Sequence, residues 1–332
     1  MISIRQSAFA AALLALTLTT ACGQKTYENP VVDTSLPDPT IIRADDGYFY
    51  LYATENIRNV PIYRSTDLVA WRYMGTCFTD ESRPQMVPDG GIWAPDINRV
   101  GDQYVLYYSK STWGGEWECG IGVATADEPT GPFTDHGKLF ISNEIGVQNS
   151  IDPFFIDDDG HKWLFWGSFR GIYGIELSDD GLSLKPGAEK VQIAGTLTEG
   201  TYICKHDGYY YLIGSAGTCC EGLNSTYRVM VARSKSLLGP YVDKNGGEAL
   251  ENNFSLLLER SDKVVGPGHN SEIVQDDAGQ YWMFYHGFDA ADPDTGRKLY
   301  LDQIFWDNEG WPQIRNRQPS VKAPAPRFGA GA

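Results

Sequence analysis

Phe49-Tyr50-Leu51-Tyr52 is the first of five short apolar runs that decide the fold of this 332-residue chain. The other four are Tyr104-Val105-Leu106-Tyr107, Lys162-Trp163-Leu164-Phe165, Tyr210-Tyr211-Leu212-Ile213 and Tyr281-Trp282-Met283-Phe284. Each run is rich in aromatic and aliphatic residues and is bounded by turn residues, which is the pattern of a buried β-strand. Equivalent positions in successive runs lie 55, 58, 48 and 71 residues apart. The chain therefore repeats a unit that is long enough for a four-stranded sheet.

Turn signals punctuate this repeat. Asp46-Gly47, Asp159-Gly160, Asp207-Gly208 and Ala278-Gly279 precede four of the runs, and such pairs favour tight hairpins between antiparallel strands. Five units of this kind are too many for a simple sandwich, and the pattern lacks the 3.6-residue periodicity of helices. The sequence therefore predicts an all-β protein, a five-bladed β-propeller.

One position of the repeat carries chemically notable side chains in every unit. Counting 12 to 14 residues back from the third residue of each run reaches Asp38, Trp93, Asp152, Glu199 and His269. In a propeller this position lies on the innermost strand of each blade, at one mouth of the central channel. A single acid beside a proline or glycine is commonly a turn residue, but unrelated turn acids have no reason to share a register. We predict that three carboxyls, an imidazole and an indole converge on one functional site.

Three carboxyls at a water-filled mouth suit the hydrolysis of a glycosidic bond, in which one carboxyl donates a proton and another accepts one. Like charges that are held together push their pKa values apart, so one acid stays protonated near neutral pH while another ionises. The spacing does not say which acid has which role. A sugar-binding propeller without catalysis is the alternative, although it would not need three register-matched acids.

Six motifs lie in order along the chain: Leu36-Pro-Asp-Pro-Thr40, Ile92-Trp-Ala-Pro-Asp-Ile97, Asn149-Ser-Ile-Asp-Pro153, Trp166-Gly-Ser168, Thr198-Glu-Gly200 and Gly266-Pro-Gly-His-Asn270. Together they resemble glycoside hydrolase family 43, a family of five-bladed propeller enzymes that act on polymers containing arabinose and xylose. The resemblance covers about residues 30–317. It implies an inverting mechanism with Asp38 as general base and Glu199 as general acid. Asp152 is then the acid that raises the pKa of Glu199 and orients it.

Further segments are most similar to the endo-1,5-α-L-arabinanase branch of this family. They are Cys219-Cys220, Asn224-Ser-Thr-Tyr-Arg228, Tyr285-His286 and Trp306-Asp-Asn-Glu-Gly-Trp-Pro312. Pro37 departs from that branch, because many arabinanases have His immediately before the base. Proline at this position is more usual in exo-acting α-L-arabinofuranosidases and β-xylosidases, which remain the alternative.

The same resemblance implies ligand-binding roles. His269 is expected to hold Ca²⁺ or another cation on the propeller axis, largely through waters. The alternative is a histidine that only forms hydrogen bonds beneath the acids, since hard cations prefer oxygen ligands. Trp93 is expected to stack on a sugar face. Asn149, Ile151 and Ser168 are expected to line the innermost sugar subsite, with His286 as a wall residue of the same cavity. No organic cofactor is expected.

The charge balance limits the partners. The chain has 43 acidic against 27 basic residues, and its net charge of −16 repels phosphate backbones and anionic membranes. Nucleic acid is therefore excluded as an expected partner. A neutral plant cell-wall polysaccharide fits both the charge and the resemblance, with arabinan first and arabinoxylan or xylan second. We expect the protein to act as a monomer.

The N-terminal residues have the pattern of an export signal. Arg5 is followed by an apolar run from Ala8 to Leu18 and by small residues that lead to Cys22, and this run is too short to span a bilayer. Thr19-Thr-Ala-Cys22 is similar to a bacterial lipobox. We therefore expect residues 1–21 to be a signal peptide, Cys22 to be the lipid-anchored first mature residue, and residues 22–29 to be a tether. The alternative is ordinary cleavage without a lipid.

The propeller is then expected over residues 30–320, with a tail at 321–332. The protein would lie in the periplasm or at the cell surface and touch the membrane only through its anchor. The five remaining cysteines lack the spacing of a zinc site. The adjacent Cys219 and Cys220 allow either a vicinal disulfide or two buried thiols.

Overall fold

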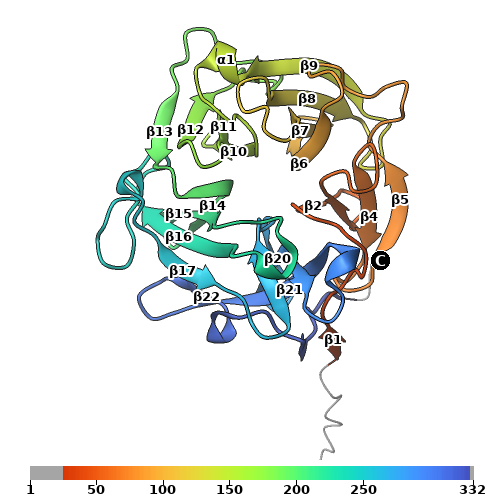
Figure 1. The fold of residues 1–332 in the computed structure, drawn as a ribbon, viewed down its shortest axis with the longest axis vertical. Coiled ribbons are helices and arrows are strands. Elements are labelled where there is room, and N and C mark those ends of the chain that lie inside the picture. Colours follow the sequence, from red (N-terminus) through yellow and green to blue (C-terminus); the bar gives the residue numbers. More distant parts are fainter. Residues whose placement is uncertain (1–24, 330–332) are drawn as a thin grey trace, which may run out of the picture.

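Each of the five apolar runs lies in the second strand of a separate antiparallel sheet in the computed structural model, which describes residues 25–329. Figure 1 shows the five sheets arranged around a common centre, with β2, β6, β10 and β14 nearest to it. The predicted five-bladed β-propeller is thereby confirmed.

The blades follow one another along the chain. Blade 1 contains β2 (Thr40–Arg43), β3 (Phe49–Tyr52), β4 (Pro61–Ser65) and β5 (Arg72–Thr76). Blade 2 contains β6 (Gly91–Val100), β7 (Gln103–Ser111), β8 (Gly120–Ala126) and β9 (Thr134–Ile141). Blade 3 contains β10 (Phe154–Asp158), β11 (His161–Trp166), β12 (Ile172–Glu176) and β13 (Val191–Ala194).

Blade 4 contains β14 (Thr198–His206), β15 (Tyr209–Ala216), β16 (Arg228–Ser234) and β17 (Ser255–Leu258). Blade 5 contains β18 (Val264–Gly268), β19 (Ile273–Gln275), β20 (Tyr281–Asp289), β21 (Arg297–Trp306) and β22 (Pro312–Gln313), in which β18 and β19 both pair with β20. The described helices are short: α1 (Ser142–Ile145) and the 3-10 turns η1 (Gly222–Asn224), η2 (Ala249–Glu251), η3 (Pro293–Thr295) and η4 (Arg315–Arg317).

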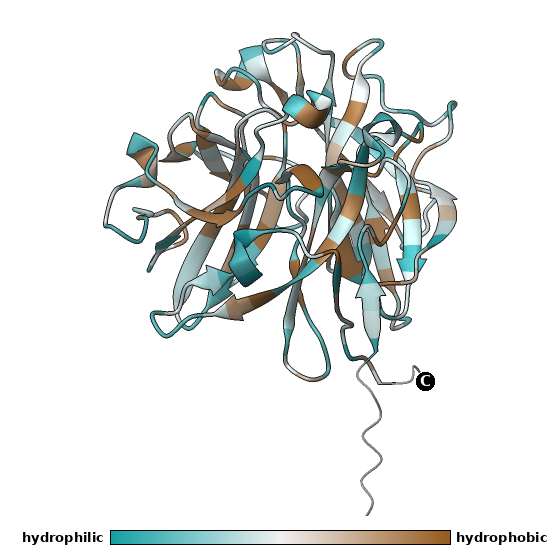
Figure 2. Ribbon diagram, turned by 60° about the horizontal axis from the view of Figure 1, so that its bottom comes forward, coloured by the Kyte–Doolittle hydropathy of each residue, from teal (hydrophilic) through white to brown (hydrophobic). Residues whose placement is uncertain are grey.

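The second strands each contain a continuous apolar run because each blade is covered on both faces by its neighbours. All four residues of β3 are buried, and so are all seven of β8 in the third position of its blade. Between the first and last blades, Phe49 and Leu51 pack in one core with Trp282 and Phe284. Figure 2 shows the same division, with hydrophobic colour along the strands and hydrophilic colour on many of the loops. A strand that is buried on two faces has a continuous apolar run in place of an alternating pattern.

Tight turns join the inner strands to these second strands. At Asp159-Gly160 both residues have positive φ, 54° and 88°, and at Asp207-Gly208 the values are 46° and 72°. This is the type I′ geometry that Asp-Gly sequences favour, and its twist matches that of the flanking strands.

The two ends of the chain close the ring. Strand β1 (Thr26–Glu28) pairs with β23 (Lys322–Pro324), and the segment that follows β1 runs beside β21 before it enters blade 1. Along it, the Val31 amide donates to the Leu299 carbonyl at 2.9 Å and the Leu36 amide donates to the Arg297 carbonyl at 2.8 Å. The expected tether 22–29 and tail 321–332 therefore contain segments that pack on the propeller.

The predicted signal peptide, residues 1–21, and Cys22 lie outside the described residues. In the part of the chain that the structure describes, no helix is both long enough and apolar enough to cross a bilayer.

Candidate active site

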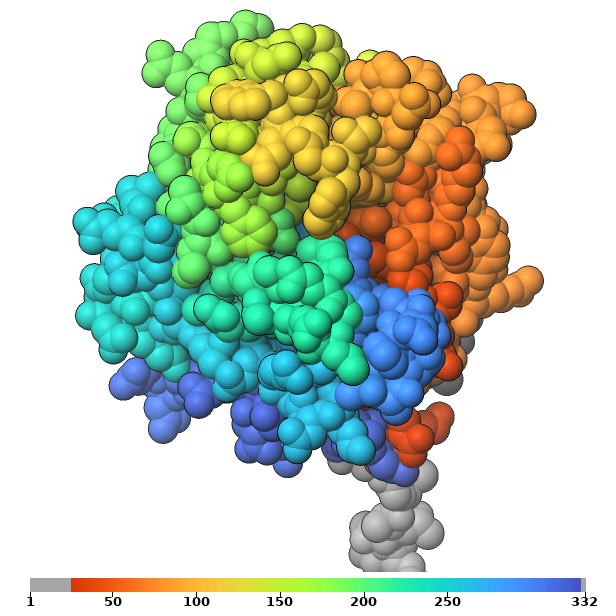
Figure 3. All heavy atoms as spheres, in the orientation of Figure 1, coloured from red at the N-terminus to blue at the C-terminus, as the bar shows by residue number. Residues whose placement is uncertain are grey.

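All five register-matched side chains face one cavity of about 640 Å³. Asp38 precedes β2, Trp93 lies in β6, Asp152 precedes β10, Glu199 lies in β14 and His269 follows β18. Figure 3 shows one face of the ring, on which parts of the chain far apart in sequence, drawn in different colours, meet around the centre. The structure therefore brings together, in one cavity, residues that are separated by more than two hundred positions in the chain.

A recurrent backbone feature aims these side chains into the cavity. Asp38, Asp152 and His269 have positive φ angles of 55°, 60° and 46°, and in the two remaining blades the next residue, Ala94 or Gly200, takes this conformation at 39° or 61°. Residues other than glycine rarely adopt the left-handed region. The pairing register also shifts next to this position in blades 2, 4 and 5. Such irregularities bend a strand and redirect a side chain, and they concentrate at functional sites.

Glycine is required at position 200 for two reasons. Its φ is positive, and a Cβ atom added there would lie 3.1 Å from Cγ of the His269 ring. The Gly200 amide also donates a hydrogen bond to Asp152 Oδ2 at 3.1 Å. Blade 4 therefore fits its inner strand closely against His269 and Asp152 at the same point.

Asp38 is surrounded by groups that stabilise its ionised form. Its Oδ1 lies 3.2 Å from Arg297 Nη1, 3.3 Å from His269 Nδ1 and 3.1 Å from His286 Nδ1, and the Thr54 hydroxyl donates to Oδ2 at 2.5 Å. Burial alone would raise the pKa of Asp38, but the neighbouring groups, first among them the Arg297 guanidinium, outweigh it and hold the pKa well below its ordinary value. Asp38 is therefore a carboxylate that can accept a proton.

Glu199 is held by two hydroxyl donors. Tyr227 Oη donates to its Oε1 at 2.8 Å, and Ser168 Oγ donates to its Oε2 at 2.6 Å. Burial raises the pKa of Glu199, the two hydrogen bonds lower it, and the nearby Asp38 charge raises it, so that the net direction is upward. A carboxyl with a raised pKa can donate a proton near neutral pH.

Asp152 lies deeper in the same acidic group. Its backbone amide donates to Ser109 Oγ at 2.8 Å. Burial raises its pKa well above the ordinary value, and the charges of Glu199 and Asp38 raise it further. Because Asp152 and Glu199 disfavour each other's charge, the pair retains one proton at a pH where a lone carboxyl has lost it.

The cavity walls carry the groups expected to bind a sugar. Trp93, Asn149, Ile151 and Ser168 all line it, and Asn149 Nδ2 donates to Ser168 Oγ at 2.9 Å. Ser168 in turn donates to Glu199, so one side chain connects the wall to the raised-pKa acid. The Trp113 ring lies 6.5 Å from the Trp93 ring and is 82% exposed. The cavity thus has an aromatic rim above an acidic floor.

Comparison with known proteins decides the family. The sequence model of the family described as Glycosyl hydrolases family 43 matches residues 27–312. This protein belongs to that family. It is a glycoside hydrolase family 43 enzyme.

Relatives of this family 43 enzyme are named for two different activities. Over 92% of each chain it is 33% identical to the extracellular exo-α-(1→5)-L-arabinofuranosidase of Cellvibrio japonicus. It is 34% identical to an extracellular endo-α-(1→5)-L-arabinanase of Bacillus subtilis, over 83% of this chain and 87% of that one. Among solved structures, the α-L-arabinanase of Cellvibrio cellulosa in complex with arabinohexaose has a TM-score of 0.78 at 33% identity, and covers 85% of this chain and 95% of that chain.

His286 does not have the position expected for it in this family 43 enzyme. It was expected in the cavity wall, but its side chain is fully buried beneath Asp38. The Tyr227 ring stacks on it at 5.6 Å, and the Asp38 amide donates to its Nδ1 at 3.1 Å. Burial and then Arg297 lower the pKa of His286 to about 4. It supports Asp38 from below and is not placed to touch a sugar.

Sequence reasoning missed three side chains that hold the acids: Arg297, Thr54 and Tyr227. Tyr227 falls in the Asn224–Arg228 motif, but nothing in that motif indicates a hydrogen bond to Glu199. Cys219 and Cys220 are joined as a vicinal disulfide and line the cavity. The alternative of two buried thiols therefore does not hold for this pair.

Proposed function

We propose that this family 43 enzyme hydrolyses α-1,5-linked arabinan by inverting general acid/base catalysis. The observation that carries this proposal is the opposite behaviour of carboxyls in one cavity: Asp38 has a strongly lowered pKa, whereas Glu199 and Asp152 have raised ones. Separate environments for two carboxyls are what an acid and a base in the same reaction require. The family match over residues 27–312, a range that contains all six sequence motifs, supports the same assignment.

The three acids then have distinct tasks. The Asp38 carboxylate accepts a proton from the water that attacks the anomeric carbon, and Arg297 keeps this carboxylate ionised. Glu199 retains its proton and gives it to the leaving oxygen. Asp152 raises the pKa of Glu199 because the two carboxyls disfavour each other's charge and the pair keeps one proton. Asp152 is also linked by Gly200 to the strand that carries Glu199. Trp93 would stack on a sugar ring, and Asn149, Ile151 and Ser168 would line the innermost subsite.

These roles are tested by comparing two substrates. Glu199→Gln should lose far more rate on arabinan than on a nitrophenyl arabinoside, because nitrophenolate leaves without protonation. Asp38→Asn should lose about 100- to 10,000-fold on both substrates, because water needs the base in either case. A sugar-binding propeller without catalysis would show no hydrolysis in the wild type. Equal losses in the Glu199→Gln variant would contradict its role as the acid.

We propose endo action, which cleaves bonds within the chain. The Bacillus subtilis relative and the fungal arabinan endo-1,5-α-L-arabinosidases support this mode, whereas the Cellvibrio japonicus relative and Pro37 favour the exo-acting alternative. The product profile on linear and debranched arabinan distinguishes them. Endo action yields a mixture of oligosaccharides from the first minutes, whereas exo action releases one small product. Xylan and nitrophenyl xyloside test the β-xylosidase alternative in the same assay.

We also propose a cation, Ca²⁺ in the first place, near His269. Within residues 25–329, no group of three His, Cys, Asp or Glu side chains is arranged to hold a metal ion, so water would supply most of the ligands. The residues fit such a cation in two respects. First, burial lowers the pKa of His269, which leaves its imidazole neutral. Second, two buried oxygens lack a hydrogen-bond partner: Thr201 Oγ1, in the residue after Gly200, and Asn270 Oδ1, in the residue after His269.

When bound, the cation would supply positive charge close to the acids. Chelation followed by elemental analysis and a thermal melt tests this proposal. A cation that serves the site lowers the melting temperature on its removal. A protein that carries no metal and is unaffected by a chelator would leave His269 as a hydrogen-bonding residue.

Export and lipid anchoring through Cys22 complete the proposal, supported by the lipobox-like sequence and by relatives whose names include the word extracellular. Wild-type protein should partition with membranes and Cys22→Ala should not. Equal partitioning of both would contradict the anchor. A monomer is proposed for the cleaved protein and is tested by its mass in solution.

A further inference from the structure

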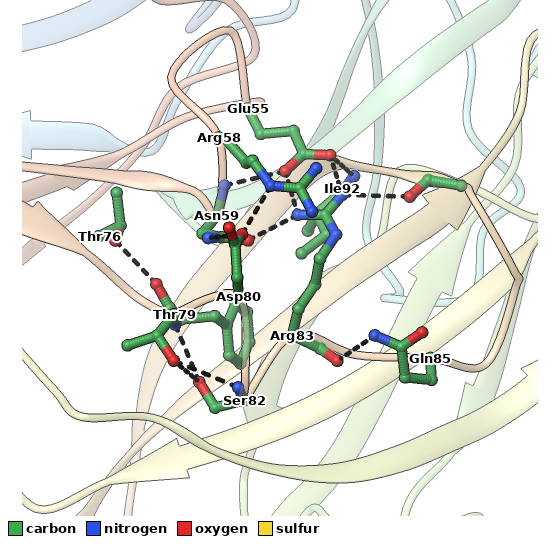
Figure 4. A network of polar contacts seen from close by, with 12 residues as sticks. Glu55, Arg58, Asn59, Thr76, Thr79, Asp80, Ser82, Arg83, Gln85 and Ile92 are labelled. Atoms are coloured by element: carbon green, nitrogen blue, oxygen red, sulfur yellow. Dashed lines mark hydrogen bonds and ion pairs between the residues drawn. The ribbon is translucent and has the colours of Figure 1, made fainter.

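A buried ion pair lies beside the cavity without lining it. Glu55 follows β3, and Arg83 lies in the connection between blades 1 and 2 (Figure 4). The Arg83 guanidinium donates Nη1 to Glu55 Oε2 and Nη2 to Glu55 Oε1, both at 2.5 Å, and the two side chains are only 8% and 10% exposed. A buried ion pair is weak evidence for stability by itself, because desolvation offsets the attraction of the charges. The role of this pair is therefore better judged from the backbone groups that it holds in place.

The Glu55 carboxylate connects the ion pair to the inner strand of blade 2. The Ile92 amide donates to Glu55 Oε1 at 2.7 Å, and the Glu55 amide donates to the Ile92 carbonyl at 3.2 Å. Ile92 immediately precedes Trp93, the aromatic side chain of the cavity wall. Glu55 therefore fixes the start of β6, from which Trp93 projects.

The neighbouring residue Thr54 connects the pair to Asp38. The Thr54 amide donates to the Pro37 carbonyl at 2.9 Å, and its hydroxyl donates to Asp38 Oδ2 at 2.5 Å. The same hydroxyl accepts a hydrogen bond from the Ala94 amide at 2.7 Å. Thr54 is thus held between the residues that flank Asp38 on one side and Trp93 on the other.

We propose that the Glu55–Arg83 pair positions the general base, Asp38, and the neighbouring Trp93. By fixing Thr54 and Ile92, it sets the orientation of Asp38 and the place of Trp93, although neither charged side chain lines the cavity. The inference rests on the proposed function, in which Asp38 is the general base. A positioning role of this kind matters because a displacement of about 1 Å at a reacting group can cost about 100-fold in rate.

The test compares three variants of the same network. Glu55→Gln keeps the shape of the side chain but removes its charge, and Arg83→Lys keeps the charge but loses the two-pronged geometry. Arg58→Gln is the matched control. Arg58 Nε donates to Asp80 Oδ1 at 2.7 Å in the same network, but both side chains are more than 60% exposed, and Arg58 forms no hydrogen bond with Thr54 or Ile92 (Figure 4).

We expect each of the first two variants to lose about 10- to 100-fold in kcat/KM. The loss should be the same on arabinan and on the nitrophenyl arabinoside, as for Asp38→Asn and unlike Glu199→Gln. The control should stay within about twofold of the wild type. Rates are measured at a temperature where circular dichroism shows each variant to be folded.

A variant that melts at a lower temperature but keeps the wild-type kcat and KM would overturn the inference, because the pair would then be purely structural. A loss of kcat/KM on arabinan alone would also overturn the inference, because that pattern is expected when the general acid, Glu199, is impaired. If Glu55→Gln does not fold, Arg83→Lys still provides the melting temperature and the kcat/KM values on both substrates. A wild-type protein that leaves arabinan intact would contradict the proposed function instead, and the variants are then compared on whichever aryl glycoside the wild type cleaves.

Discussion

Replacing Tyr227 with phenylalanine should move the basic limb of the pH–rate profile to higher pH. The substitution removes one hydroxyl, which donates to Glu199 Oε1 at 2.8 Å, and it retains the ring that stacks on His286. This hydrogen bond favours the ionised form of Glu199, so its loss raises the pKa of Glu199 and keeps the acid protonated to higher pH.

The size of this shift follows from the contact. A hydrogen bond to a charged group contributes about 1.5–3 kcal/mol, and about 1.36 kcal/mol corresponds to one pKa unit. The remaining donor, Ser168 Oγ at 2.6 Å, compensates in part, so we expect a rise of about 1 pKa unit. The assay is kcat/KM on arabinan as a function of pH, since this ratio reports the free enzyme's essential groups.

Tyr241→Phe is the matched control, because Tyr241 is also buried in blade 4 but donates to the Leu237 carbonyl, away from the acids. Its basic limb should coincide with that of the wild type. A basic limb that stays in place or moves to lower pH in Tyr227→Phe would refute the reasoning, because Glu199 could not then be the group that titrates there.

Three further predictions concern the other charges. Asp152→Asn should move the basic limb in the opposite direction, to lower pH, because the two acids no longer repel; an upward shift would contradict their coupling. Arg297→Gln should move the acidic limb to higher pH by about 1–3 units, since an adjacent Arg lowers an Asp pKa by that much, while Arg297→Lys should shift it less. Burial raises the pKa values of Asp96 and Glu272 in the folded state, so the ionisation of these two carboxyls destabilises the protein as the pH rises from about 4. Between pH 5 and pH 8 the melting temperature of Asp96→Asn should therefore fall by less than that of the wild type. An equal fall in both proteins would contradict this prediction.

The strand pattern was predictable because the physics behind it is local. A strand covered on both faces is apolar over most of its length, and Asp-Gly favours a tight turn, so runs such as Phe49–Tyr52 can be recognised in the sequence. The equivalent positions of Asp38, Asp152 and Glu199 followed from the repeat, since equivalent residues of repeated units occupy equivalent places around a ring. Only Glu199 lies within its inner strand, whereas Asp38 and Asp152 lie just before theirs. No single one of these acids would have been distinguishable from a turn residue.

The electrostatic surroundings of the acids were not predictable in the same way. Arg297 lies 259 positions from Asp38, and the two meet only because the last blade closes against the first. Nothing in the local sequence distinguishes Arg297 from the other basic residues of the chain. The depth of His286 was also hidden, because a register along a strand gives the direction of a side chain and not what covers it. The positive φ angles at Asp38 and Asp152 likewise arise from tertiary packing.

The stereochemistry of the first-formed sugar tests the central claim most directly. If Asp38 activates a water while Glu199 protonates the leaving oxygen, the water attacks the anomeric carbon from the face opposite the leaving group. Proton NMR during the first minutes of hydrolysis, before mutarotation equilibrates the product, should then show the anomer opposite in configuration to the substrate. A product of retained configuration would contradict the account, because it would require a carboxylate that attacks the sugar itself.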